Sequence, residues 1–523
     1  MIKRIVILFL AIFSFSESFS QKNYTRLHRD VLEEATLYFY EEDYQTALSI
    51  YEQLYVIDSS FNEINYLIGA CMINIRGKED DAFPYLEIAV EGDIKEANFW
   101  FARAYHIRMD FENAIKYYKV YEHFPEKEVS DEEIKRFLEI SIRAEEMISN
   151  PVEIELENLG PGVNSIFSEY VPLISSDQTE IYFTSRRPDG IGGEMDDFNN
   201  YFEDIYYSQL IDGDWAPAIN VGPPLNTSTH DATVSLTSNG NEMIIYRTNK
   251  NLTGGDLYLS QHSTTGWGTP LKLTENVNSQ YQEASAITGP DGEIMYIASN
   301  RPGGYGGKDI YRVRKLPNDE WSLPENLGPT INTAYDEDAP FIHADGLTLY
   351  FSSNGMETMG GFDIFESVLG ENGFWSIPKN MGYPLNTVKD DIYFVMSPDS
   401  RSGYYSSDMA GGYGQQDIYK INILYDNKNV VVVKGQTVDL ISQKPLKSRI
   451  TVIDQNKREI QGFYLSNAVT GKFILIVQPD RNYKIIIEAN GYQELSRQIR
   501  VDNNNESYLQ EEEKKFELSL LTE

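Results

Sequence analysis

Residues 332–365 decide the fold, and they read NTAYDEDAPFIHADGLTLYFSSNGMETMGGFDIF. An Asn and a small hydroxyl residue open the stretch, Asp345-Gly346 joins two short runs of alternating apolar residues, and a Gly-rich segment leads to Asp363-Ile364-Phe365. An Asp-Gly pair between alternating runs predicts a β-hairpin. The stretch therefore predicts three short strands in succession.

The same pattern recurs about every 53 residues. Its third strand begins at Asp204, Asp256, Asp309, Asp363 and Asp417. Its opening Asn lies at Asn164, Asn226, Asn278, Asn332 and Asn386. Four copies end in a strand that carries Trp215, Trp267, Trp321 or Trp375. Four short strands in each repeat predict the blades of a β-propeller.

The two ends of this region predict how the ring closes. The fifth copy has no Trp strand after Asp417, and residues 153–160 match the end of such a strand before the first copy begins. We expect this N-terminal strand to complete the last blade, which gives a five-bladed propeller over residues 151–424, with six blades as the alternative. The repeat resembles the WD-type repeat of the TolB protein and of envelope proteins of the outer-membrane-protein-A group.

An acid follows the hydroxyl residue of every copy by four positions. At equal phase in a ring, these carboxylates would lie near one mouth of the channel and could hold a cation or a basic peptide. The alternative is that each acid caps a turn or pairs within its own blade. The predicted channel-mouth acidic ring consists of Glu169, Asp231, Glu283, Glu337 and Asp391.

Residues 27–149 carry a helical repeat. Ala35, Ala70 and Ala102 are each followed twelve positions later by another alanine. This pattern, with a period near 34 residues, resembles the tetratricopeptide repeat, and Ser130 begins a capping box for a last helix. The resemblance implies a concave groove for protein partners, although a place in the core is the favoured interpretation for the aromatic and Leu positions of the groove. The partner-binding residues that it implies are Asn74, Phe99, Arg103 and His106.

Residues 430–523 contain short alternating strands separated by turn residues. This part resembles the carboxypeptidase regulatory-like domain, a small β-sandwich that implies a spacer or contact module and no peptidase.

The first twenty residues predict a signal peptide. Lys3 and Arg4 precede an apolar run, and small residues end at Ser20. No later stretch is long and apolar enough to span a membrane directly. Cys71 is the only cysteine, so no internal disulfide can form, and the net charge of -36 argues against a nucleic-acid partner.

The order of these parts resembles outer-membrane-protein-A-type envelope proteins associated with type IX secretion and gliding. The sequence stops where a peptidoglycan-binding domain follows in the fullest members, so we treat peptidoglycan binding as doubtful. The resemblance implies a periplasmic, outer-membrane-associated scaffold that holds other envelope proteins. The sequence has no Gly-x-Ser-x-Gly or His-Glu-x-x-His motif, and we expect no enzyme activity, cofactor or metal. The alternative is a ligand-binding or sensor propeller for a glycan or a cation.

Overall fold

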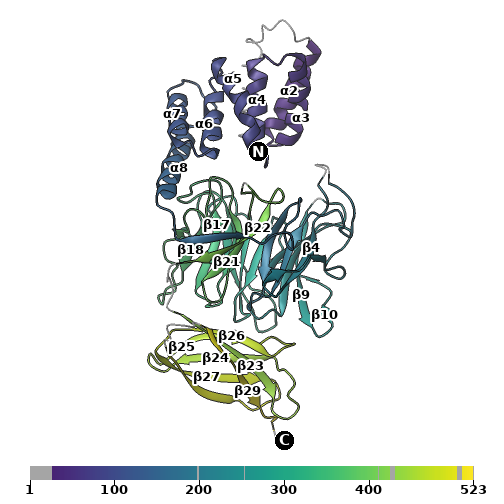
Figure 1. Cartoon of the computed structure of the whole chain (residues 1–523), viewed down its shortest axis with the longest axis vertical. Coiled ribbons are helices and arrows are strands. Elements are labelled where there is room, and N and C mark those ends of the chain that lie inside the picture. The colour runs from purple at the N-terminus through teal and green to yellow at the C-terminus, as the bar shows by residue number, and fades with distance from the viewer. Residues whose placement is uncertain are drawn as a thin grey trace. The chain divides into compact units, whose positions relative to one another are not determined.

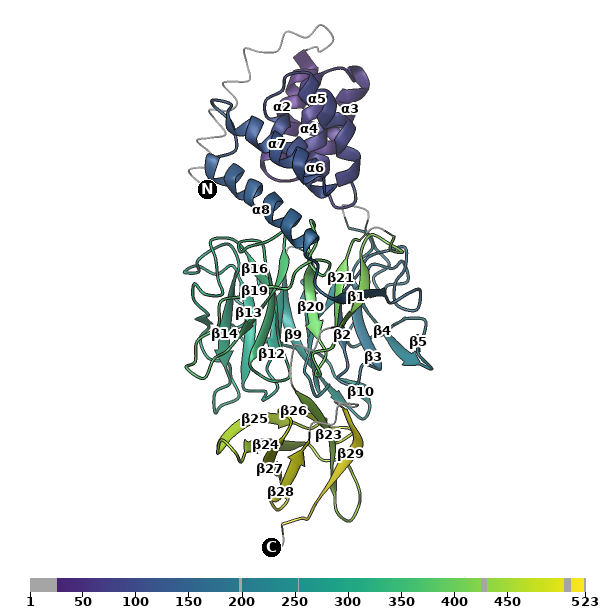
Figure 2. The same cartoon turned by 60° about the vertical axis from the view of Figure 1, so that its left-hand side comes forward.

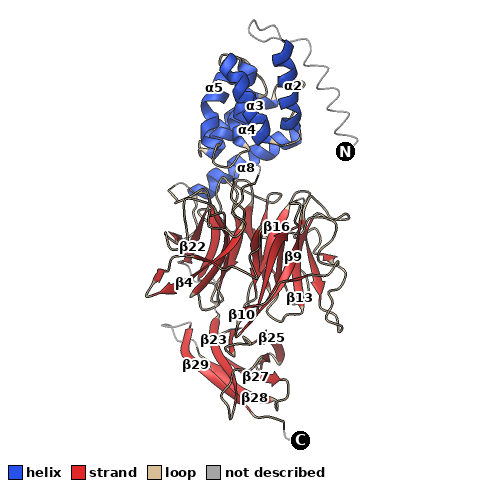
Figure 3. Ribbon diagram, turned by 90° about the vertical axis from the view of Figure 1, so that its right-hand side faces the viewer, coloured by secondary structure: helices blue, strands red, loops and turns tan. Residues whose placement is uncertain are grey.

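The computed structural model describes residues 26–196, 200–252, 254–409, 411–424, 430–502 and 509–521. The expected signal peptide, residues 1–20, lies outside them. The chain divides into two compact units, Met1–Ile142 and Arg143–Glu523. Helices make up the regular structure of the first unit, and strands make up nearly all of that of the second (Figures 1 and 3).

The described helices come in antiparallel pairs followed by one longer helix. The six alanines of the repeat are fully buried, which lets neighbouring helices pack closely. Ser130 Oγ accepts the backbone N–H of Glu133 at 3.1 Å, so the predicted cap of the last helix is confirmed. The helices are α2 (Arg26–Tyr40), α3 (Tyr44–Ile57), α4 (Asn62–Ile73), the short 3₁₀ turn η2 (Glu79–Asp81), α5 (Ala82–Glu91), α6 (Ala97–Ile107), α7 (Phe111–Glu122) and α8 (Asp131–Ser149).

In the second unit, five sheets of four or five strands each follow one another along the chain. The first two contain β2 (Glu169–Ile174), β3 (Glu180–Ser185), β4 (Asp204–Ile211), β5 (Asp214–Trp215) and β6 (Ile219–Asn220), then β7 (Asp231–Leu236), β8 (Glu242–Thr248), β9 (Gly255–Ser263), β10 (Gly266–Trp267) and β11 (Leu271–Lys272). The next two contain β12 (Ser285–Thr288), β13 (Ile294–Ser299), β14 (Asp309–Arg314) and β15 (Glu325–Asn326), then β16 (Glu337–Ile342), β17 (Thr348–Ser353), β18 (Asp363–Val368) and β19 (Lys379–Asn380). The last contains β20 (Ile392–Met396), β21 (Ser402–Ser407), β22 (Asp417–Ile423) and β1 (Ile154–Asn158).

The sheets form a closed ring. The first strand of each sheet contacts the first strand of the next, and β20 of the last sheet contacts β2 of the first. Strand β1 pairs antiparallel with β22, so the predicted completion of the last sheet by the N-terminal strand is confirmed (Figure 2). The ring is therefore closed by a strand that lies at the start of the sequence.

The opening Asn of each copy joins neighbouring sheets. Asn332 accepts the backbone N–H of Ile310 at 2.8 Å and donates to the carbonyl of the same residue at 3.0 Å. Equivalent pairs of bonds are present in every copy, and Asn164 makes them to Ile418 across 254 positions of sequence. Because these groups are buried, their hydrogen bonds explain why the repeat requires an Asn at this position.

Two further sheets share one apolar core in the C-terminal part of the second unit. They contain β23 (Val431–Asp439), β26 (Lys472–Val477) and β29 (Leu509–Leu518), and β24 (Ser448–Asp454), β25 (Glu459–Leu465), β27 (Arg481–Ala489) and β28 (Leu495–Val501). None of the helices in the described ranges could cross a membrane.

The C-terminal sheets dock on hairpin ends of the ring. Asn241, in the β7–β8 hairpin, donates to the carbonyl of Ser466 at 3.0 Å and accepts the backbone N–H of Ala468 at 2.6 Å. Beside these bonds, Ala344 in the β16–β17 hairpin packs in one apolar cluster with Val432 and Ile476. Buried hydrogen bonds and apolar contacts thus fix this part of the chain to the ring.

Candidate functional site

Two of the four predicted partner-binding residues are buried. Phe99 is 3 % exposed, and its ring centroid lies 5.7 Å from that of Tyr118 and 5.4 Å from that of Phe137 in α8. His106 is 7 % exposed, and its Nδ1 lies 3.0 Å from Ser141 Oγ, also in α8. The structure contradicts an accessible groove at Phe99 and His106, because α8 packs against both side chains.

Asn74 and Arg103 are partly exposed. Asn74 donates its side-chain amide to the carbonyl of the residue four positions earlier, at 2.8 Å. The Arg103 guanidinium lies 4.9 Å from the ring centroid of Phe137 and 5.6 Å from that of Trp100, within the range of cation–π contacts. A partner-binding role for Asn74 and Arg103 stays a prediction.

Every acid of the predicted channel-mouth ring caps the turn before its own strand. In the fourth copy, the backbone N–H and the hydroxyl of Thr333 each donate to the carboxylate of Glu337 at 2.7 Å. The other copies have the same arrangement. None of these side chains is more than 4 % exposed: Glu169, Asp231, Glu283, Glu337 and Asp391.

The acids therefore do not form an open binding ring. Their oxygens accept hydrogen bonds within their own copy, as in the turn-capping alternative. The part of the chain that the structure describes contains no group of three or more His, Cys, Asp or Glu side chains that could hold a metal ion. The spacing of the acids predicts that they occupy equivalent positions in the ring, but it does not predict where their side chains point. The sequence therefore could not distinguish a binding ring from a set of turn caps.

The copies differ in how the buried acid is neutralised. Arg187, Arg247 and Arg301 contact the acids of the first three copies. The fourth and fifth copies have no arginine at or directly after the end of their second strand. Burial, with a contribution from the nearby carboxylate of Asp363, raises the pKa of Asp391 well above its usual range. The Oδ1 atom of Asp391 is buried and has no hydrogen-bond donor among the described residues.

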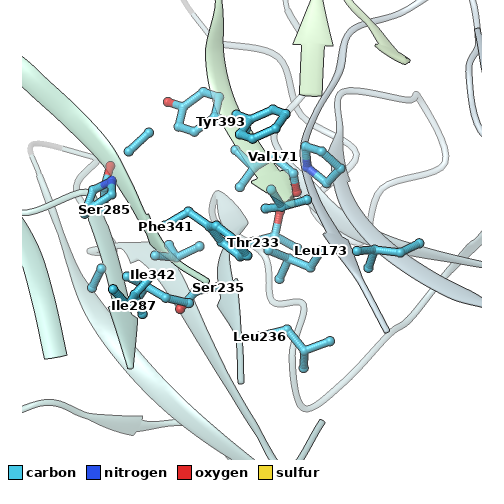
Figure 4. A pocket seen from close by; sticks show the side chains of 18 of the residues that line it. Val171, Leu173, Thr233, Ser235, Leu236, Ser285, Ile287, Phe341, Ile342 and Tyr393 are labelled. Carbon is cyan, nitrogen blue, oxygen red and sulfur yellow. Dashed lines mark hydrogen bonds between the residues drawn. The ribbon is translucent and has the colours of Figure 1, made fainter. Parts of the chain in front are cut away.

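A cavity of about 250 Å³ lies where the first strands of the five sheets meet. Strands β2, β7, β12, β16 and β20 all contribute to its wall. The wall is largely apolar, as the side chains of Val171, Leu173, Ile287, Phe341 and Ile342 show (Figure 4). This cavity is a candidate ligand site, because ligand sites are concave and mostly apolar.

The two ends of the cavity differ. At the end where the first strands begin, the lining includes Tyr170 and Glu203. At the hairpin end it includes Ala344 and Pro398, and Ala344 is also the residue that packs against the C-terminal sheets. A ligand would therefore approach from the end that carries Tyr170 and Glu203.

Three residues of the wall have a backbone conformation that is rare for their type. The φ angles are 50° at Val171, 48° at Ala339 and 64° at Tyr393. Each lies at a register shift in the first strand of its sheet, two positions after the capping acid. A β-branched residue such as Val171 is strained at positive φ. Strain of this kind concentrates at ligand-binding positions.

A buried polar cluster borders the same end of the cavity. The Tyr170 hydroxyl donates to Glu203, Arg186 Nη2 lies 2.9 Å from Glu203 Oε1, and His230 Nδ1 lies 3.1 Å from Glu203 Oε2. Arg186 also pairs with Asp196 at 3.1 Å. Burial opposes ionisation of Glu203, but the hydrogen bond from His230 and the charge of Arg186 outweigh it and lower the pKa of Glu203 to about 2.

Sequence analysis missed this cluster, although a signal was present. Glu203 directly precedes the Asp that begins a third strand, and the other copies have no acid at that position. Comparison of the five copies with one another would have singled it out. The equivalent residues are Gly255, Lys308, Phe362 and Gln416.

No family model matches this sequence, and no curated protein matches it. Among solved structures, the tetratricopeptide-repeat domain of Sgt2 from Aspergillus fumigatus is similar to 24 % of this chain, over 84 % of its own length, with 21 % identity and a TM-score of 0.22. An α-L-arabinofuranosidase from Lactobacillus brevis is similar to 50 % of this chain, over 92 % of its own length, with 12 % identity and a TM-score of 0.32.

Prolyl oligopeptidase B from Galerina marginata is similar to 63 % of this chain, over 39 % of its own length, with 8 % identity and a TM-score of 0.27. At these scores we draw no conclusion about this chain from the similarities, and the activities named are those of the other proteins.

Proposed function

We propose that this protein is a non-enzymatic scaffold of the cell envelope that holds protein partners together. In this proposal the first unit is a tetratricopeptide-type solenoid, the ring is a five-bladed β-propeller, and the C-terminal sheets are a regulatory-like sandwich. The signal-peptide pattern of residues 1–20 and the order of the parts favour a periplasmic, outer-membrane-associated location. They also favour a role in type IX secretion or gliding.

The observation that carries the proposal is the docking of the C-terminal sheets on the ring. Asn241 makes two hydrogen bonds across this contact, and its side chain is 6 % exposed. Between the two partners of Asn241 in the sequence, the side-chain amide of Asn467 donates to the carbonyl of Asn239 at 2.8 Å. Two modules fixed in this way present their surfaces at a constant spacing, which suits a protein that positions several partners.

The way the repeat uses its polar residues supports the same proposal. The Asn and acid of every copy are buried and bonded within the ring, so these residues serve the architecture rather than a reaction. In this proposal, partners therefore bind to side chains other than the Asn and the acid that recur in every copy.

Affinity purification of the tagged full-length protein, at native abundance and from membranes in mild detergent, tests the proposal. We expect a fixed set of envelope proteins to co-purify in constant ratio. Asn241→Ala should release part of that set, because it loosens the docking of the C-terminal sheets, whereas Glu371→Ala, in an exposed ion pair of the same contact, should release none. Recovery of the protein alone, with or without chemical cross-linking, would rule the scaffold out.

A further inference from the structure

We infer that the cavity at the centre of the ring binds a small uncharged molecule with an apolar body and a single hydrogen-bonding group. This inference goes beyond a scaffold role, because a scaffold needs no ligand inside its ring. It also replaces the cation and the glycan considered from the sequence with a different class of ligand.

The shape of the cavity is fixed by the fold. Val171, Ala339 and Tyr393 occupy equivalent positions on three of its walls, all at positive φ. The register shifts at these positions bring residues of the first strands into the cavity wall. A wall held in a strained conformation by five interlocked sheets does not have to be reorganised when a ligand binds.

The equivalent residues on the other two walls, Thr233 and Ser285, are polar but already bonded. Thr233 Oγ1 lies 2.8 Å from the carbonyl oxygen of Val171, to which it can donate. Ser285 Oγ donates to Asp338 Oδ1 at 2.5 Å, and Lys308 Nζ lies 2.7 Å from the other oxygen of that carboxylate. These groups tie neighbouring sheets together. They leave the body of the cavity apolar.

The charges near the cavity are also matched. Glu203, the charged residue of the lining, is held by Tyr170, Arg186 and His230. A charged ligand would lose its hydration on entry, which is costly, and the described residues of the lining offer it no unpaired counter-ion. The Tyr170 hydroxyl donates to Glu203 and accepts from Arg186 Nε at 3.3 Å. A neutral hydroxyl or amide of the ligand would therefore donate to the remaining lone pair of this hydroxyl.

The size of the cavity sets the size of the ligand. About 250 Å³ is far more than the roughly 10–15 Å³ that one water molecule needs, and it suits a molecule of roughly ten non-hydrogen atoms. The C-terminal sheets lie against the hairpin end, so the Tyr170 end is the entrance.

Binding of 4-propylphenol to the full-length protein tests the inference, with 4-propylbenzoate and 4-propylbenzylamine as charged counterparts that share the propylphenyl body and are slightly larger. Calorimetry and the shift of the melting temperature are the measurements. We expect saturable one-to-one binding of the phenol, a rise in melting temperature, and at least tenfold weaker binding of both charged compounds.

Ala284 lines the entrance and is exposed, so Ala284→Trp should block the cavity without disturbing the core. We expect this variant to lose at least tenfold in affinity for the phenol while its melting temperature without ligand stays unchanged. Ala334 is also exposed but lies outside the lining, and Ala334→Trp is the matched control, with unchanged affinity. Ala232→Phe is a second blocking variant. It keeps the test possible if Ala284→Trp does not fold.

Three outcomes would overturn the inference. The first is no binding of the phenol at millimolar concentration. The second is equal binding in the blocked variants and the control, which would place the phenol elsewhere on the protein. The third is tighter binding of the amine or of the carboxylate, which would identify a charged ligand.

Discussion

At the scale of single residues, the opening Asn of each copy has the clearest energetic role. Asn332→Ala would leave the buried N–H of Ile310 without a partner, and the carbonyl of Ile310 with only the backbone N–H of Leu327. We expect a loss of about 2–4 kcal/mol in the free energy of unfolding, from two buried hydrogen bonds. Urea unfolding measures it. The exposed Asn318→Ala is the control and should change the free energy of unfolding little. If the two substitutions had equal effects, the bonds of Asn332 to the neighbouring sheet would not contribute to stability.

Replacement of Asp391 should stabilise the protein, in contrast to replacement of Asn332. Its pKa is raised in the folded protein, so the folded state holds its proton more tightly than the unfolded state. Stability should therefore fall as pH rises from the ordinary pKa of an aspartate toward the folded value. Asp391→Asn removes this loss and keeps an oxygen for Thr387, so we expect it to raise the free energy of unfolding at pH 8 by about 1–3 kcal/mol.

The fall in stability between pH 5 and pH 8 should also be smaller in Asp391→Asn than in the natural protein. Asp363, whose pKa burial raises to about 7, contributes a fall of its own over the same interval in both proteins. Asp231→Asn is the contrast. Burial raises the pKa of Asp231 as well, but this substitution would leave the partner Arg247 without its carboxylate, so it should destabilise. Urea unfolding at several pH values measures the free energy of unfolding of each variant. The prediction would be wrong if Asp391→Asn were less stable than the natural protein at pH 8.

At the scale of elements, strand β1 should be indispensable to the ring. Deletion of residues 152–159 removes the partner of β22 and the Asn158 amide that donates to Asp417 at 2.7 Å. The exposed edge of β22 invites association between molecules. We expect a lower melting temperature and concentration-dependent aggregation, measured by calorimetry and light scattering. Glu155→Ala, on the exposed side of β1, is the control and should behave like the natural protein.

The strands were predictable because their pattern repeats. The Asp of the repeat begins β4, β14, β18 and β22, and in the second copy it is the second residue of β9. Predicting β1 required two observations: the last copy lacks a strand, and residues 153–160 match the end of one. The covering of Phe99 and His106 was not predictable, because α8 lies outside the repeat and its packing cannot be inferred from the spacing of the alanines. The cavity was hidden for a similar reason, since no spacing in the sequence indicates the register shifts that shape its wall.

At the scale of the whole molecule, Asn241 should decide whether the ring and the C-terminal sheets unfold together. Asn241→Ala leaves the carbonyl of Ser466 and the N–H of Ala468 unpaired in a buried contact. We expect a lower melting temperature for the C-terminal sheets than for the ring, together with faster hydrogen exchange in β23 and β26. Glu371→Ala at the rim should leave one transition, because an exposed ion pair contributes little. A single unchanged transition in Asn241→Ala would mean that the apolar contacts alone hold the parts together.

The closing strand also fixes the order in which this molecule can be finished. Asn164 bonds to a residue 254 positions later, and β1 lies before Asn164 in the sequence. At 5–20 residues per second, a ribosome takes about 13–50 s to make the intervening chain. The strand that completes the ring is thus the first strand of the ring to be made, and it must wait for the last copy before it can pair. Until then β22 and β1 each lack the strand that pairs with them in the finished ring, and such unpaired edges invite association between molecules.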